Sequence, residues 1–212
     1  MIVAVIPARG GSKGIPRKNI KEFCGQPLIN WSIKEALKSK YIDEVYVSTE
    51  DAEIANIAEA AGAKILWRPE DLATDDATTK DVLRHFVNNI ECDTLVVLQP
   101  TSPIRILGII DKAIERFFET KVDTLATGFT SYEYEWTSVD NTPRQKLQGW
   151  FYDDGNIYVH KPDYLKEGEY WGEKKEKMII DRYYNYEIDT EVDWVILEAL
   201  MNYLKDKLGD QI

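Results

Sequence analysis

The first 128 residues alternate between short hydrophobic runs and longer segments in which apolar residues recur every three or four positions. The hydrophobic runs predict β-strands, at residues 2–7, 44–49, 63–67, 94–99 and 123–127. The longer segments predict amphipathic helices between these strands, near residues 28–39, 51–61, 78–89 and 108–119. Because short apolar strands that alternate with helices indicate βαβ units, we expect an α/β fold: three layers, α/β/α, around a mostly parallel, Rossmann-like sheet.

The alternation stops after about residue 128. Residues 130–155 are rich in Tyr, Trp, Asp and Asn without a clear period, which predicts an excursion from the sheet, either a small hairpin or a dimerisation arm. A strand is expected again at 156–160, a charged loop at 166–177 and an amphipathic helix at 191–204. No internal repeat divides the chain, so we expect residues 1–212 to form a single domain with an arm at 130–150.

A glycine-rich basic loop, residues 8–19, follows the first strand. Its glycines let the backbone approach a ligand closely, and its N–H groups can point at phosphate oxygens. The first acidic residue of the chain is Glu22, although the formal net charge is −11, so positive charge is concentrated in this loop. The loop matches neither the Walker nor the dinucleotide-binding pattern. It predicts a site for a phosphorylated nucleotide; a solvated turn is the alternative.

A second polar segment, Gln-Pro-Thr-Ser-Pro-Ile-Arg at residues 99–105, lies at the end of a predicted buried strand. Its two prolines fix the backbone and present Gln99, Thr101 and Ser102 rigidly. Ligands of parallel sheets bind at the carboxyl ends of the strands, so this segment is a candidate binding site. A proline-stiffened turn is the alternative.

A third segment, residues 68–79, follows the predicted strand at 63–67. It could wrap a nucleotide base, with Arg68 and Thr79 as hydrogen-bonding groups. An ordinary loop with a Thr or Asp helix cap is the alternative.

The fourth segment is Glu187-Ile-Asp-Thr-Glu191. In extended chain, residues two apart point to the same side, so Glu187 and Asp189 could converge on one cation. Magnesium prefers a few carboxylates together with water and substrate phosphates. In the competing interpretation Asp189 or Thr190 caps the last helix, with Asp193 completing a box-like pattern; both roles are compatible.

Together these segments resemble motifs of the acylneuraminate cytidylyltransferase family, the CMP-sialic acid and CMP-nonulosonate synthetases. The resemblance covers essentially the whole chain, and its motifs occur in the family's order at residues 8–19, 68–79, 98–105, 155–158 and 188–191. It implies a fold of the nucleotidyltransferase type. It also implies an Mg²⁺-dependent enzyme that joins CTP to a nonulosonic, sialic-acid-like α-keto acid sugar, giving CMP-sugar and pyrophosphate.

The resemblance also implies roles for individual residues. Arg9, Lys18 and Asp189 would be catalytic. The nucleotide would be bound by Ala8, Arg9, Gly10, Gly11, Ser12, Lys13, Lys18, Asn19, Arg68, Ala77 and Thr79, with the basic side chains on the phosphates and Asn19, Arg68 and Thr79 on the cytosine side. The sugar would be bound by Gln99, Thr101, Ser102, Arg144 and Tyr158, with Arg144 paired to its carboxylate. Asp189 would ligate magnesium, with Glu187 as a second ligand.

Three departures from the family pattern leave the sugar open. Glu187 stands where the family usually has aspartate, and Tyr152 stands where it often has arginine. Residues 128–144 form a shorter stretch than in the N-acetylneuraminate enzymes of the family. Legionaminic acid and a deaminated sialic acid are therefore candidate sugars. Two alternatives remain: another sugar nucleotidyltransferase, with an octulosonate or phospho-sugar substrate, and a non-catalytic nucleotide-binding homologue.

Composition limits the remaining function classes. The chain has 212 residues and a sequence pI near 4.8, and such an acidic surface would repel a nucleic-acid backbone. No apolar stretch approaches the ~18 residues of a membrane span, and residues 2–6 resemble a strand rather than a signal peptide. Cys24 and Cys92 are too few for a disulfide framework. We expect a cytoplasmic protein, most simply a homodimer, without nucleic-acid or membrane partners.

Overall fold

Strand β1 (Ile2–Pro7) lies in the middle of the sheet, between β4 (Glu44–Thr49) and β6 (Thr94–Val97), and is parallel to both. Its side chains alternate between two hydrophobic clusters: Ala4 and Ile6 enter one, Val3 and Val5 the other. A strand that is buried on both faces requires a continuous apolar run, which is why its bounds match the prediction.

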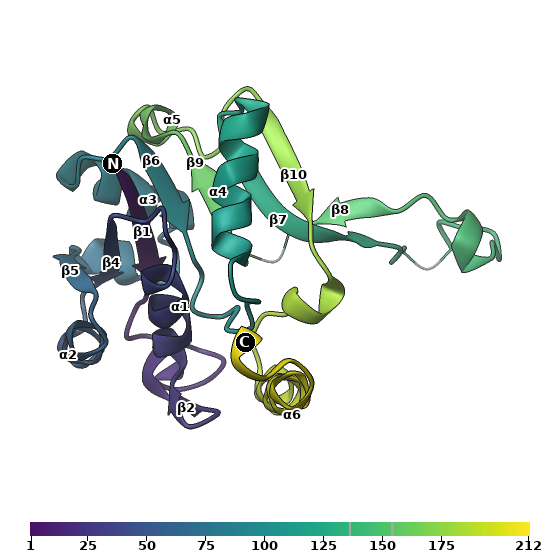
Figure 1. The fold of residues 1–212 in the computed structure, drawn as a ribbon, viewed down its shortest axis with the longest axis horizontal. Helices are drawn as coiled ribbons and strands as arrows, with labels where there is room; N and C mark the ends of the chain where they lie inside the picture. Colours follow the sequence, from purple (N-terminus) through teal and green to yellow (C-terminus); the bar gives the residue numbers. More distant parts are fainter. Residues whose placement is uncertain (136, 154) are drawn as a thin grey trace.

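The computed structural model describes residues 1–135, 137–153 and 155–212. Within these residues the strands form an eight-stranded sheet in the order β10-β7-β9-β6-β1-β4-β5, with β8 paired to β7 (Figure 1). The remaining strands of this sheet are β5 (Lys64–Trp67), β7 (Thr124–Ser131), β8 (Trp150–Tyr152), β9 (Tyr158–His160) and β10 (Lys175–Ile179). The pairs formed by β1, β4, β5 and β6, and the pair β7–β10, are parallel, whereas β9 is antiparallel to β6 and β7.

Helices cover both faces of the sheet (Figure 1), which confirms the predicted three-layer α/β architecture. One cluster packs α1 (Leu28–Leu37), α2 (Ala52–Ala60) and α4 (Ile109–Thr120) against the sheet. The opposite cluster contains residues of α3 (Thr79–Asn89) and α5 (Pro162–Lys166). Among the described residues, no helix is both long and apolar enough to cross a membrane.

A third hydrophobic cluster attaches the last helix, α6 (Glu191–Leu208), beside the nucleotide loop. Trp194 and Leu197 of α6 pack with Ile15 from the loop and with Phe23 from the small hairpin β2 (Glu22–Phe23) and β3 (Gln26–Pro27). Because α6 is docked on this hairpin, the segment that precedes it is carried to the carboxyl end of β1.

The excursion after residue 128 contains the predicted small hairpin. β7 continues to Ser131, and β8 pairs with its last residues in antiparallel register. Beyond these strands the chain projects from the sheet as an arm (Figure 1), which carries the 3-10 helix η3 (Arg144–Lys146). Dimerisation through this arm stays a prediction.

Some predicted boundaries were wrong. The strand expected at 94–99 ends at Val97, and the expected charged loop 166–177 contains α5's last residue and the start of β10. β10 escaped detection because Lys175, Glu176 and Lys177 give it the charged composition that is common on edge strands. The hairpin β2–β3 was also missed, since two-residue strands have no period to detect.

Candidate active site

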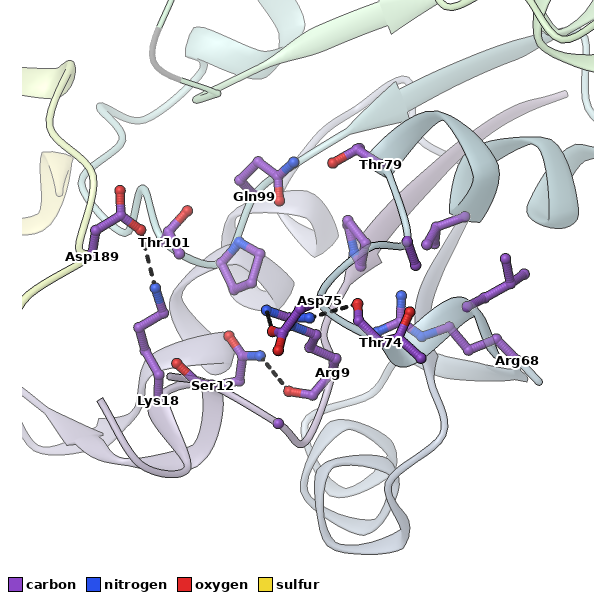
Figure 2. Close-up of a pocket in the computed structure, with 17 residues that line it drawn as sticks. Arg9, Ser12, Lys18, Arg68, Thr74, Asp75, Thr79, Gln99, Thr101 and Asp189 are labelled. Carbon is purple, nitrogen blue, oxygen red and sulfur yellow. Dashed lines mark hydrogen bonds and ion pairs between the residues drawn. The ribbon is translucent and has the colours of Figure 1, made fainter. Parts of the chain in front are cut away.

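A cavity of about 360 Å³ opens at the carboxyl ends of β1, β5 and β6, where the sequence predicts ligand binding (Figure 2). Three segments far apart in the sequence enclose it: the nucleotide loop, the loop after β5 and the turn after β6. Eleven of the site residues predicted from the sequence line this cavity: Arg9, Gly11, Ser12, Lys18, Asn19, Arg68, Ala77, Thr79, Gln99, Thr101 and Asp189. The structure thus brings together most of the residues assigned to the nucleotide, together with one of the two assigned to metal.

Carboxylates at the end of β4 hold the nucleotide loop from behind. Glu50 accepts a hydrogen bond from the N–H of Gly10 at 2.7 Å, and Asp51 pairs with Arg17, whose Nη2 lies 2.9 Å from Oδ1. The Arg17 guanidinium lowers the pKa of Asp51 to about 2. A Cβ on Gly10 would overlap the Asp51 carboxylate, so a larger residue here would have to displace that carboxylate from the loop.

The positive charges of the loop face the third polar segment. Arg9 donates to the carbonyl of Thr74 at 2.7 Å, and Arg9 and Lys13 both pair with the carboxylate of Asp75, at 2.9 and 2.7 Å. Lys13, and then Arg9, hold the pKa of this carboxyl below its usual range. Asp75 also lines the cavity and is the carboxylate with which Arg9 and Lys13 pair. It was not among the site residues predicted from the sequence.

The cavity combines Arg68, a buried cation that the sequence analysis assigned to the base, with apolar lining residues. Arg68 is 7% exposed, its Nε lies 3.3 Å from Glu50, and burial lowers the pKa of its guanidinium. Leu72 and Val82 are apolar residues that also line this cavity. These two apolar residues were missed, although a flat base requires such a surface beside its hydrogen-bonding groups.

The cavity ends at Asp189, which faces Lys18 (Figure 2). Lys18 Nζ donates to the carbonyl of Ile188 at 2.7 Å and lies 3.2 Å from Asp189 Oδ1. The cap of α6 is Thr190, whose hydroxyl accepts from the N–H of Asp193 in a capping box. Capping therefore does not consume the Asp189 side chain, which is 71% exposed and points to the site.

A second cavity, of about 240 Å³, shares Asp189 with the first. Its lining residues are Phe129, Glu133, Tyr152, Arg182, Asn185, Tyr186, Glu187, Asp189 and Asp193. The Glu187 carboxylate lies near Gln99, a residue of the first cavity. Both side chains approach Gly155: a Cβ placed on this glycine would lie 2.6 Å from Glu187 Oε1 and 3.1 Å from Gln99 Cγ. Asp189 therefore stands where the two cavities meet.

Magnesium fits these donors. Glu187 and Asp189 offer carboxylate oxygens, the type of ligand that Mg²⁺ prefers, and Asp189 lies at the edge of the cavity that Arg9, Lys18 and Arg68 line. Across the described ranges, no group of three His, Cys, Asp or Glu side chains forms a metal cage. One or two carboxylates completed by substrate phosphates and water are a common arrangement for Mg²⁺, so this pair suits it better than a tightly caged metal.

Several predicted site residues lie outside both cavities. Ala8, Gly10 and Ser102 are not lining residues: Ala8 is 1% exposed, with its N–H bonded to the carbonyl of Ser48, and Ser102 is fully buried. Lys13 reaches the first cavity only through Asp75.

Two residues assigned to the sugar, Arg144 and Tyr158, also do not line either cavity. Tyr158 is 7% exposed, donates to Asp153 and packs against Tyr170 and Trp171. Arg144 lies on the arm, with its guanidinium 5.8 Å from the Tyr132 ring. Their proposed contacts with the sugar stay predictions.

A mostly parallel α/β sheet with a cationic pocket at its carboxyl edge is typical of nucleotide-binding proteins. Residues 3–166 match the family model described as cytidylyltransferase, and the chain belongs to that family. It is 32% identical to N-acylneuraminate cytidylyltransferase A of Danio rerio, over 93% of this chain and 50% of that protein. It is also 32% identical to CMP-N,N'-diacetyllegionaminic acid synthase of Legionella pneumophila, over 98% of this chain and 99% of that protein.

The relatives differ in length. The chain spans about half the length of the Danio rerio protein and of N-acylneuraminate cytidylyltransferase from Oncorhynchus mykiss. Among solved structures, that of CMP:2-keto-3-deoxy-manno-octonic acid synthetase complexed with CTP is similar with a TM-score of 0.76, covering 95% of this chain and 98% of that one. The identity is 18%, so this likeness shows the fold alone.

Proposed function

We propose that the chain is a cytidylyltransferase that joins CTP to a nonulosonic α-keto acid sugar. The anomeric hydroxyl of the sugar attacks the α-phosphorus, the bond from that phosphorus to the bridging oxygen breaks, and CMP-sugar, pyrophosphate and a proton are formed. The relatives named above act, by their names, on N-acylneuraminate and on N,N'-diacetyllegionaminic acid, which are sugars of this class.

The observation that carries the proposal is the position of Asp189 between two cavities of opposite character. The first contains the cations Arg9, Lys18 and Arg68, as a triphosphate requires. The second contains mostly carboxylates and aromatic rings. An α-phosphate at the end of the first cavity would meet a hydroxyl from the second beside Asp189.

The protein's own part in the reaction is positioning and charge stabilisation. Arg9 and Lys18 would neutralise the charge that builds on the α-phosphate and the leaving pyrophosphate. Lys18 is held for this task by the carbonyl of Ile188. Magnesium, held by Asp189 and Glu187, would lower the pKa of the attacking hydroxyl. Among the described lining residues, we assign no side chain as a general base.

A substrate panel tests the proposal. The chain is incubated with Mg²⁺, each of the four nucleoside triphosphates and a set of α-keto acid sugars, and pyrophosphate and nucleotide-sugar are measured. We expect CMP-sugar from CTP and at least one nine-carbon acid. Preference for another triphosphate, or for an octulosonate or phospho-sugar, would assign the chain to another sugar nucleotidyltransferase, and nucleotide binding without turnover would make it a non-catalytic homologue.

We also propose that the enzyme works in the cytoplasm as a homodimer. Tyr134 and Trp150 on the projecting arm are 58% and 47% exposed, and aromatic side chains gathered on one segment suit contact with a second copy. The two cysteines are free, as in a reducing compartment.

A further inference from the structure

The second cavity is lined by more negative than positive side chains. Among the described residues that line it, four are carboxylates, Glu133, Glu187, Asp189 and Asp193, and one, Arg182, is a cation. An acidic sugar that entered this cavity would be repelled unless a cation neutralised its charge. Arg182 is the side chain that can do so.

The position of Arg182 is set by the turn that carries it, the 3-10 helix η4 (Arg182–Tyr184). Asp181 caps this turn by accepting from the N–H of Tyr183 at 3.0 Å. The side-chain amide of Asn185, a residue that is 3% exposed, donates to the carbonyl of Asp181 at 2.9 Å. The backbone beneath Arg182 is therefore fixed before a ligand binds.

The guanidinium is held by rings rather than by a close carboxylate. Its Cζ lies 4.8 Å from the centroid of Phe129 and 5.7 Å from that of Tyr186. Glu133 Oε1 is 3.7 Å from Arg182 Nη2, too far for a hydrogen bond, and the Glu133 side chain is 73% exposed, so this pair is weak. These ring contacts hold the guanidinium beside the cavity while its N–H groups can still donate to a ligand.

We propose that Arg182 binds the carboxylate of the sugar acid and thereby orients the attacking hydroxyl; this assignment rests on the proposed function. In an α-keto acid sugar the carboxylate carbon is bonded to the anomeric carbon, so the group that holds the carboxylate also fixes the hydroxyl on that carbon. Two other positions do not supply this cation from the same chain. Tyr152 lines the cavity without a charge. Arg144 does not line it: Arg144 lines the neighbouring cavity on the arm, which shares only Glu133 and Arg182 with this one.

The test removes the negative charge of the substrate and the positive charge of Arg182, separately and together. The wild-type chain and the Arg182→Gln variant are each assayed with CTP and with two forms of the best sugar from the panel, the acid and its neutral primary amide. Loss of the charge-assisted pair in Arg182→Gln should lower kcat/KM for the acid by roughly 10–100-fold. The amide, which has no charge to pair, should react at nearly the same rate with both proteins. The KM for CTP should not change.

The outcomes separate this assignment from the proposed function. If the wild-type chain forms no CMP-sugar from any acid, the proposed function is wrong and the role of Arg182 falls with it. If the wild type reacts but Arg182→Gln slows acid and amide equally, the proposed function stands and Arg182 is only structural.

Two further variants keep the test decisive. Arg116→Gln removes an exposed arginine that pairs with Glu176 at 2.6 Å outside both cavities, and it should behave as wild type. If Arg182→Gln does not fold, Arg182→Lys keeps the charge but not the two-pronged pairing, and it should still lose part of the preference for the acid. An unchanged acid-to-amide ratio in Arg182→Lys would then refute the assignment.

Discussion

At the residue scale, we expect Asp75 to compete with the CTP phosphates for the same cations. It pairs with Arg9 and Lys13, the cations assigned to the CTP phosphates, from a half-exposed position within the nucleotide cavity. A triphosphate would have to displace this carboxylate. Asp75→Asn should therefore tighten CTP binding by roughly 2–5-fold, the range expected for an exposed ion pair. Calorimetric titration with CTP measures this, and Asp76→Asn, a neighbouring exposed carboxylate, is the control. Weaker binding in Asp75→Asn would mean that Asp75 positions the loop instead of competing.

Asp189 and Thr190 are neighbours with separable roles. Asp189→Asn removes the charge at the junction of the two cavities, so turnover should fall by about 100-fold or more while the melting temperature changes little. Thr190→Ala removes the cap of α6, which should cost about 1 kcal/mol of stability and leave turnover per folded molecule nearly intact. Steady-state kinetics and thermal melts of both variants decide the matter. The reverse pattern would make Asp189 a structural residue and the metal interpretation wrong.

At the scale of elements, burial decided what the sequence could predict. β1 matches its predicted bounds because a strand buried on both faces needs an unbroken apolar run. β4 also matches, with Val45, Tyr46 and Val47 as its apolar centre. The nucleotide loop could be predicted because its charge and its glycines are local in the sequence. Arg182 could not, because its relation to Phe129 exists only once β10 pairs with β7 and α6 docks on the β2–β3 hairpin. Sequence patterns record local periodicity, whereas this cavity is made by long-range packing.

β9 carries a histidine that makes stability depend on pH. His160 is buried among Tyr158, Tyr170 and Trp171, and burial lowers its pKa to about 3. The unfolded chain would bind a proton near pH 6.5, so between these pKa values it holds more protons than the folded chain, and stability falls as pH decreases. From pH 6.5 to 5.0 the loss should be about 2 kcal/mol.

The variant His160→Phe keeps a ring in this position and removes the titration. Urea unfolding at pH 7.5 and 5.0 should show a much smaller pH effect in His160→Phe than in the wild type. His85→Gln is the matched control, because His85 is only half-buried and should contribute less. Equal pH dependence in the wild type and His160→Phe would show that other groups cause the acid loss.

At the scale of the whole molecule, the arm raises the question of which chain's site it serves. Arg144 does not line the cavity that contains Asp189, but it lines a neighbouring cavity with Tyr132 and Leu147 of the arm, and Arg182 lines both cavities. In Figure 1 the arm points away from the body that carries α6. Arg144 could contact the sugar either in its own chain's site, next to Arg182, or in the site of a second copy.

Mixing Arg144→Ala subunits with Asp189→Asn subunits tests this exchange, once each variant alone has been shown to have lost activity. Arg144→Ala subunits keep Asp189, and Asp189→Asn subunits keep the arm's arginine. A mixed dimer with exchanged arms has one intact site and one site with both defects, so random mixing should restore about a quarter of wild-type activity. A subunit that carries both changes is the control, because pairing it with either single variant leaves each site with a defect. If activity does not return after subunit exchange has been verified by mass, Arg144 does not act across a dimer, and Arg182 remains the cation that we assign to the sugar carboxylate.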